Sequence, residues 1–220
     1  MKTVAIRDRV IASLATTSGA YRLSEVEAAL PPTKRGYPIS RPLARLLSRL
    51  ILNVPFQSVL EFGAGVSSVI MALSLKHGGG GRLTTIENDL TYCSDRWQTI
   101  SQLECVDTCL VVSPLRQTEI FGRKMNIYAN AGPKIAERGP YDIVFIDGPE
   151  GKYGREGTLH QSYAYLRDGA VIILDDCKRA SERTAIRRWL SAYPNLEPIL
   201  IDPQFGGRGV AILQVSKQSI

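Results

Sequence analysis

The stretch of sequence that decides the fold reads Val59-Leu60-Glu61-Phe62-Gly63-Ala64-Gly65-Val66-Ser67-Ser68. An apolar run that ends in a carboxylate predicts a buried strand, and the apolar spacing from Val66 to Lys76 predicts a helix after it. The two glycines between them let the chain turn tightly and let a ligand approach the backbone closely. This strand, turn and helix are typical of a nucleotide-type binding site in a βαβ unit.

Two carboxylates indicate which ligand this turn suits. Glu61 would repel a pyrophosphate, so we expect a ligand with positive charge and no phosphates. Glu87 ends the next apolar segment, where an acid can accept hydrogen bonds from ribose hydroxyls. Glu-x-Gly-x-Gly with an acid one strand and helix later resembles the class I S-adenosylmethionine-dependent methyltransferases. The resemblance covers residue 37 to the C-terminus, and Ser67 stands where many members have a third glycine.

Composition sets the broad class. The chain has 220 residues, 44% of them hydrophobic and 22% charged, which suits one globular core. No apolar run approaches a membrane span, and the charges in Met1–Arg9 exclude a signal peptide, so we expect a cytoplasmic protein. The net charge of +6 leans mildly toward anionic partners, but the scattered arginines form no nucleic-acid tail. The four cysteines lack Cys-x-x-Cys spacing, so we expect free thiols.

Apolar segments and helical patterns alternate along most of the chain. Strands are expected at Ser58–Phe62, Arg82–Glu87, Thr108–Val112, Ile143–Asp147, Ala170–Leu174, Glu197–Ile201 and Val210–Val215. Helices are expected after a cap at Ser40 and at Val66–Lys76, Thr91–Gln102, Gly157–Leu166 and Arg179–Ala192. The pattern predicts an α/β, Rossmann-like, seven-stranded and mostly parallel sheet with helices on both faces. No helix separates the last two strands, so we expect a C-terminal antiparallel hairpin.

We expect two parts in the chain: a helical N-terminal extension over residues 1–36 and a methyltransferase domain over residues 37–220. Ser24 and Glu27 form a capping-box pattern, and Pro31-Pro32 ends that helical segment. The extension could cover an acceptor pocket or form a homodimer contact, and both alternatives stay open.

A second motif reads Tyr141-Asp142-Ile143-Val144-Phe145-Ile146-Asp147-Gly148-Pro149. Ligands of parallel sheets bind beyond the carboxyl ends of strands, so this strand brings Asp147 to the site. The resemblance implies that Asp147 lies beside methyl donor and acceptor, as a catalytic and cofactor-binding residue, and that Ser113 contacts the adenine. The full cofactor site is then expected at Glu61, Gly63, Gly65, Ser67, Glu87, Ser113 and Asp147. The Asn/Asp-Pro-Pro-aromatic signature of amino-group methyltransferases is absent, which favours hydroxyl acceptors.

A third motif runs from Leu166 to Asp176 and resembles the catechol O-methyltransferase-like subgroup. That resemblance implies a metal site at Asp147, Asp175 and Asp176, where three oxygen donors could hold Mg²⁺ and the ion would lower the pKa of the acceptor hydroxyl. Asp176 occupies the position where the subgroup has an amide, and Glu150 occupies the position of the lysine that acts as base in that subgroup. The alternative is that the two adjacent acids only hydrogen-bond their loop.

His160 is the other candidate general base, because a histidine can take a proton near neutral pH. Lys152, Tyr153, Arg155 and Arg208 follow strand ends and could bind an anionic group of the acceptor, or could be the ordinary charges of a solvated loop. Tyr37 and Tyr128 are candidate pocket walls.

The leading hypothesis is O-methylation of a small-molecule hydroxyl by S-adenosylmethionine, with Mg²⁺ as an optional second cofactor. The alternatives are methylation of RNA or protein, an aminopropyltransferase-like or NAD-binding relative, and a non-catalytic cofactor-binding protein. Glu61 argues against NAD, and the scattered arginines argue against nucleic acid. We expect a small-molecule partner and no membrane partner.

Overall fold

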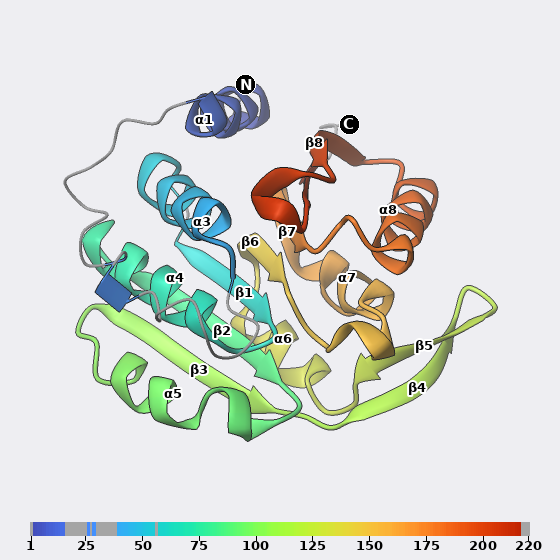
Figure 1. Cartoon of the computed structure of the whole chain (residues 1–220), viewed down its shortest axis with the longest axis horizontal. Coiled ribbons are helices and arrows are strands. Elements are labelled where there is room, and N and C mark those ends of the chain that lie inside the picture. Colours follow the sequence, from blue (N-terminus) through green and yellow to red (C-terminus); the bar gives the residue numbers. More distant parts are fainter. Residues whose placement is uncertain (1, 16–25, 27, 30–38, 56, 217–220) are drawn as a thin grey trace.

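The structure is a computed structural model that describes residues 2–15, 26, 28–29, 39–55 and 57–216 of the chain. It has three layers, with one central sheet between two layers of helices (Figure 1). The expected capping box at Ser24 and Glu27, the Pro31-Pro32 break, Tyr37 and the boundary between residues 36 and 37 lie outside the described residues.

The central sheet has seven strands in the order β3-β2-β1-β6-β7-β9-β8. Their bounds are Ser58–Phe62 for β1, Gly81–Glu87 for β2, Val106–Val112 for β3, Tyr141–Ile146 for β6, Leu166–Asp175 for β7, Leu196–Asp202 for β8 and Val210–Val215 for β9. Neighbouring strands from β3 to β7 pair in parallel, and β9 pairs antiparallel with both β7 and β8. The mostly parallel sheet and its C-terminal antiparallel hairpin are therefore confirmed. The strand order reverses between β1 and β6, which is where parallel sheets open a crevice for a ligand.

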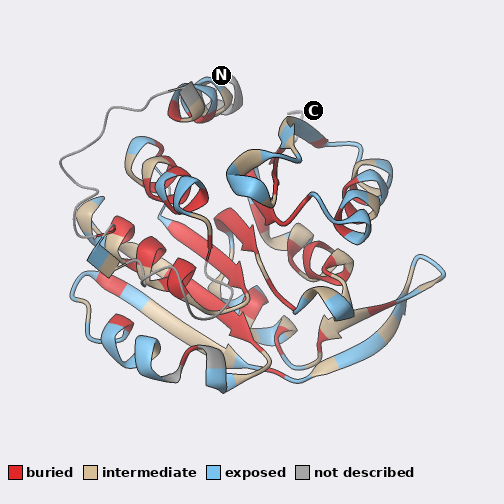
Figure 2. Cartoon of the chain, viewed as in Figure 1, coloured by how far each residue is buried: buried red, intermediate tan, exposed pale blue. Residues whose placement is uncertain are grey.

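Helices cover both faces of the sheet. The elements α1 (Lys2–Ala15), α3 (Arg41–Asn53), α4 (Val66–His77) and α5 (Ser94–Ile100) pack into one apolar cluster, and α6 (Gly132–Arg138), α7 (Glu156–Ser162) and α8 (Ala180–Ala192) pack into a second one on the other face. Helix α3 begins where expected, because the Ser40 hydroxyl accepts from the Leu43 amide at 3.3 Å. The central strands are buried over nearly their whole length (Figure 2). No described helix combines the length and apolarity needed to cross a bilayer.

The sequence interpretation missed one hairpin and the short helix α6. Strands β4 (Leu115–Ile120) and β5 (Arg123–Tyr128) form a separate antiparallel ribbon that projects from the body of the molecule (Figure 1). Their two-residue loop is Phe121-Gly122, with φ of 50° and 71°. Positive φ at both loop residues matches the twist of a tight hairpin, so the Gly122 position was the available signal. Polar residues on both strands hid the ribbon from a search for apolar runs.

Two boundaries also differ from expectation. The helix expected over Gly157–Leu166 ends at Ser162, and a 3-10 turn over Tyr163–Tyr165 leads into β7. Strand β7 begins at Leu166 because that residue pairs with Tyr141 of β6, a contact between distant parts of the chain. Tertiary pairing therefore overrides the local helical pattern.

Candidate active site

A cavity of about 510 Å³ lies at the carboxyl ends of the parallel strands. The loops after β1, β2, β6 and β7 all contribute to its wall, and Arg208 closes it from the loop before β9. Of the residues expected in the cofactor and metal sites, those that line it are Gly63, Glu87, Asp147 and Asp176. The cavity lies where the reversal of strand order predicts a ligand site.

The two glycines after β1, Gly63 and Gly65, have different structural roles. Gly63 has a φ of +93°, and a Cβ there would lie 2.5 Å from the Gly148 backbone nitrogen. Gly148 is equally crowded, since its own Cβ would lie 2.6 Å from both Gly63 Cα and Tyr128 Oη. Gly63 therefore lets the loops after β1 and β6 touch. Gly65 is extended, with a φ of 176°, and a Cβ on it would meet nothing within 4 Å, so space for a ligand lies beside Gly65.

Glu61 lies behind this loop and is fully buried. Its carboxylate accepts from the hydroxyls of Ser67 at 2.5 Å, Ser68 at 2.6 Å and Thr85 at 2.7 Å. Burial raises the pKa of Glu61 to about 7, because desolvation of the charge outweighs these three hydrogen bonds. Glu61 and Ser67 thus fix the first turn of α4 to β1. Neither residue lines the cavity in the described structure, and their expected contacts with a cofactor stay predictions.

Glu87 lies where the sequence placed it, at the end of β2 and on the cavity wall. One carboxylate oxygen accepts from the Ala64 amide at 2.7 Å, and the other accepts from the amides of Asn88 at 2.6 Å and Asp89 at 2.8 Å. Burial raises the pKa of Glu87 and is the largest influence on it. Glu87 therefore ties the loop after β1 to the loop after β2.

Ser113 and His160 are not brought to the cavity. The Ser113 hydroxyl is buried and accepts from the Asn130 amide at 2.9 Å. The His160 Nδ1 lies 2.8 Å from Tyr193 Oη, and its ring meets the edge of Phe121 with centroids 5.3 Å apart. Burial also lowers the pKa of His160. Among the described residues, neither Ser113 nor His160 lines the cavity. Adenine binding by Ser113 and general-base catalysis by His160 therefore stay predictions.

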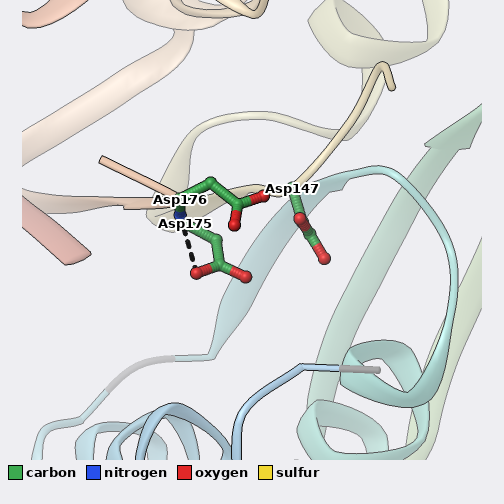
Figure 3. A group of neighbouring side chains, drawn as sticks. All are labelled: Asp147, Asp175 and Asp176. Atoms are coloured by element: carbon green, nitrogen blue, oxygen red, sulfur yellow. Dashed lines mark hydrogen bonds between the residues drawn. The ribbon is translucent and has the colours of Figure 1, made fainter. Parts of the chain in front are cut away.

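The three expected metal ligands do meet, as Figure 3 shows. One carboxylate oxygen from each of Asp147, Asp175 and Asp176 lies within 4.8 Å of the others. The acids come from the ends of the neighbouring strands β6 and β7, and Asp176 adopts a left-handed φ of 61°. Burial raises the pKa of Asp175 to about 7, with the nearby Asp147 charge as the next cause, and burial raises the pKa of Asp147 as well.

The sequence interpretation missed the buried partner of these acids. Arg155 was a candidate for binding the acceptor or for a solvated loop, and in the structure its side chain is only 4% exposed and forms ion pairs with Asp147 and Asp176. Arg179 forms a second ion pair with Asp176, at 3.0 Å. No local pattern marks Arg155, because its partners are brought to it by the turn at Gly148-Pro149 and by β7.

Comparison with known proteins places the chain in a family. The model of the methyltransferase domain family matches residues 60–177, which is more than half of the chain. No curated protein sequence matches the chain significantly.

Solved structures with the same fold include three O-methyltransferases. An O-methyltransferase from Bacillus cereus in complex with SAH has a TM-score of 0.62 and 19% identity, covering 96% of this chain and 97% of that one. A putative O-methyltransferase from Klebsiella pneumoniae has a TM-score of 0.60 and 20% identity, covering 97% of both chains. TomG from Streptomyces achromogenes, an O-methyltransferase involved in tomaymycin synthesis and solved with SAM, has a TM-score of 0.59 and 19% identity, covering 99% of this chain and 100% of that one. With the family match over β1 to β7, these likenesses confirm that the chain belongs to the methyltransferase domain family, in the class I S-adenosylmethionine-dependent fold.

Proposed function

We propose that this protein transfers a methyl group from S-adenosylmethionine to a hydroxyl group of a small molecule. The observation that carries the proposal is the cavity at the reversal of strand order, where the loop after β1, Glu87 and Asp147 share one wall. The similarity to solved O-methyltransferases, two of which hold SAM or SAH, supports the same reaction class.

The lining of the cavity supports one orientation of the cofactor. Glu87 ends β2 and presents its carboxylate to the cavity, where it can accept hydrogen bonds from ribose hydroxyls. The open space beside Gly65 suits the portion that links ribose to sulfur. The sulfonium and its methyl group then lie toward Asp147, on the side of the loop after β6. Glu87 and Asp147, the acids on the side of the cavity assigned to the cofactor, favour a cationic cofactor over one with phosphates.

The chemistry requires positioning and the removal of one proton. The acceptor oxygen forms a bond to the methyl carbon while the carbon–sulfur bond breaks, and its electron pair stays on the sulfur. The hydroxyl proton passes to Asp147, whose ion pair with Arg155 uses Oδ1 and leaves Oδ2 to accept it. The Asp147 side chain is 24% exposed, so it is accessible from the cavity. Holding the two reactants in line supplies most of the rate gain in such a transfer.

The size of the cavity favours a small acceptor over RNA or protein. A volume of about 510 Å³ lies within the range of small-molecule sites and must hold the cofactor as well. The cavity wall mixes acids such as Asp89 and Glu150 with the basic Lys152, Arg179 and Arg208. Nucleic-acid binding would need a continuous basic face instead.

Two further parts of the proposal concern the setting of the enzyme. The first helix packs with α3 in one apolar cluster through Val10, which supports an N-terminal extension that docks on the sheet domain. The four cysteines are free thiols, which supports a reducing compartment, namely the cytoplasm.

The test is ligand binding followed by turnover. S-adenosylhomocysteine should raise the melting temperature, because it binds only the folded state, whereas NAD should not. Radiolabelled S-adenosylmethionine should then transfer its methyl group to members of a panel of phenols, sugars and hydroxy acids. Protection by NAD, or no protection by S-adenosylhomocysteine, would refute the cofactor assignment. Transfer to amines or RNA and not to hydroxyls would refute the acceptor class.

A further inference from the structure

The guanidinium of Arg155 lies within the acid cluster. Its Nη2 is 2.9 Å from Asp147 Oδ1 and 3.2 Å from Asp176 Oδ2. Its Nη1 donates to the backbone carbonyl of Asp175 at 3.0 Å, and its Nε donates to that of Pro149 at 3.3 Å. All three nitrogens of one buried side chain are therefore engaged, in the rigid fork that a guanidinium presents.

These contacts use the oxygens that a divalent cation would need. Mg²⁺ binds carboxylate oxygens at about 2 Å in a near-octahedral shell. Asp147 Oδ1 and Asp176 Oδ2 are already paired with Arg155, and Asp176 Oδ2 also lies 3.0 Å from Arg179 Nη2. A cation bound to both oxygens would be in direct contact with two positively charged groups. The donor set therefore does not fit a resident Mg²⁺.

The contacts with the two arginines leave Asp147 Oδ2 and Asp175 Oδ2 open. Asp175 Oδ2 is buried and makes no hydrogen bond within the described residues, while Asp175 Oδ1 accepts from the Asp176 amide at 2.7 Å. A cation held by these two oxygens and by water would still lie in a cluster where Arg155 and Arg179 already balance the charges of Asp147 and Asp176. Asp175 thus orients Asp176 and does not by itself restore a metal site.

We propose that Arg155 takes the place that the sequence assigned to a divalent cation, and that it holds Asp147 and Asp176 in position for a metal-independent methyl transfer. Arg155 is a positioning residue, because it acts through Asp147 and leaves Asp147 Oδ2 toward the acceptor. The statement about methyl transfer rests on the proposed function. The statement about cation binding stands without it.

Binding of Mn²⁺ tests the proposal independently of turnover. Free Mn²⁺ gives an electron paramagnetic resonance signal that disappears on binding, so a titration reports affinity directly. The parent protein should bind Mn²⁺ no more tightly than millimolar, with or without S-adenosylhomocysteine. Arg155→Met frees Asp147 and removes one of the two ion pairs of Asp176, and it should tighten Mn²⁺ binding at least about tenfold. Arg155→Lys keeps the charge and should stay close to the parent.

The matched control is Arg138→Met. Arg138 is another largely buried arginine, bonded to Thr84 at 2.9 Å and paired with Asp107 at 3.0 Å, away from the cavity. Its loss should leave Mn²⁺ binding unchanged. Once an acceptor is known, the parent should keep its activity in EDTA, Arg155→Met should lose at least tenfold in kcat, and Arg155→Lys should recover part of that loss.

The results that would overturn the proposal are equally definite. Stoichiometric, micromolar binding of Mn²⁺ by the parent, abolished by Asp176→Asn, would show that a cation displaces Arg155. So would activity that EDTA abolishes and Mn²⁺ restores. A folded Arg155→Met protein that binds Mn²⁺ as poorly as the parent would also contradict it. If Arg155→Met does not fold, the Mn²⁺ titrations of the parent and of Arg155→Lys decide the question: weak binding by both supports the proposal, and micromolar binding by the parent overturns it. If S-adenosylhomocysteine does not bind, the proposed function fails, while the Mn²⁺ titration still decides the cation question.

Discussion

The contrast between Gly63 and Gly65 gives the sharpest prediction, because the structure assigns the two glycines to different tasks. Alanine at position 63 puts a Cβ 2.5 Å from the Gly148 nitrogen, on a residue whose φ is +93°. Alanine at position 65 puts a Cβ into open space on extended backbone. The first change should therefore reduce stability, and the second should reduce cofactor binding.

The magnitudes follow from these two environments. At Gly63 the strained φ costs about 1–2 kcal/mol and overpacking about 1–3 kcal/mol. The sum of about 2–5 kcal/mol corresponds to a fall in melting temperature of roughly 4–20 °C for a chain of this size. At Gly65 the change in unfolding free energy should stay within about 1 kcal/mol. We expect it to be stabilising, because alanine makes the unfolded chain less flexible.

The assay is thermal unfolding of both variants and the parent, followed by calorimetric titration with S-adenosylhomocysteine. Gly65→Ala should keep the melting temperature of the parent and bind S-adenosylhomocysteine at least about tenfold more weakly, which is 1.4 kcal/mol. A Gly63→Ala protein as stable as the parent would refute the close approach of the two loops. A Gly65→Ala protein with unchanged affinity would refute the placement of the cofactor beside that residue.

Three further predictions concern single side chains. Glu87→Ala should weaken S-adenosylhomocysteine binding by roughly 1–3 kcal/mol in calorimetry, because it removes the expected ribose acceptor and the acceptor of three amides; unchanged affinity would contradict that role. Burial raises the pKa of Glu61 in the folded state from 4.5 to about 7, so the folded state keeps its proton to a higher pH than the unfolded state does. The free energy of unfolding should therefore fall by about 3 kcal/mol as pH rises from about 4.5 to 7. Urea unfolding at pH 5 and pH 8 should show this decrease in the parent and a smaller one in Glu61→Gln, and equal decreases would exclude Glu61 as the cause. His160→Ala should leave kcat within about threefold, because His160 bonds Tyr193 outside the described cavity wall; a loss of a hundredfold, on the scale of general-base catalysis, would restore its role as base.

Local patterns were enough for most of the fold. The apolar run at Val59 and the helical spacing after it predict β1 and α4, because side-chain periodicity depends only on near neighbours in the chain. The acids at positions 87, 147, 175 and 176 could also be placed together, since parallel strands end at the same edge of the sheet. The hairpin at Phe121-Gly122 was missed because its strands are mostly exposed and carry polar residues.

What each side chain does was decided by contacts between distant segments. The sequence offered Arg155 either as a ligand for an anionic acceptor or as an ordinary charge of a solvated loop, whereas the folded chain buries it between Asp147 and Asp176. Sequence spacing assigned Gly63 to the ligand, and the folded chain places it on the cavity wall and also against Gly148 of the loop after β6. The sequence by itself therefore determined most of the strands and helices and the edge of the sheet that carries the site. Only the tertiary structure decided which charges face the cavity and which neutralise each other, because burial and ion pairing depend on partners that the sequence pattern does not bring together.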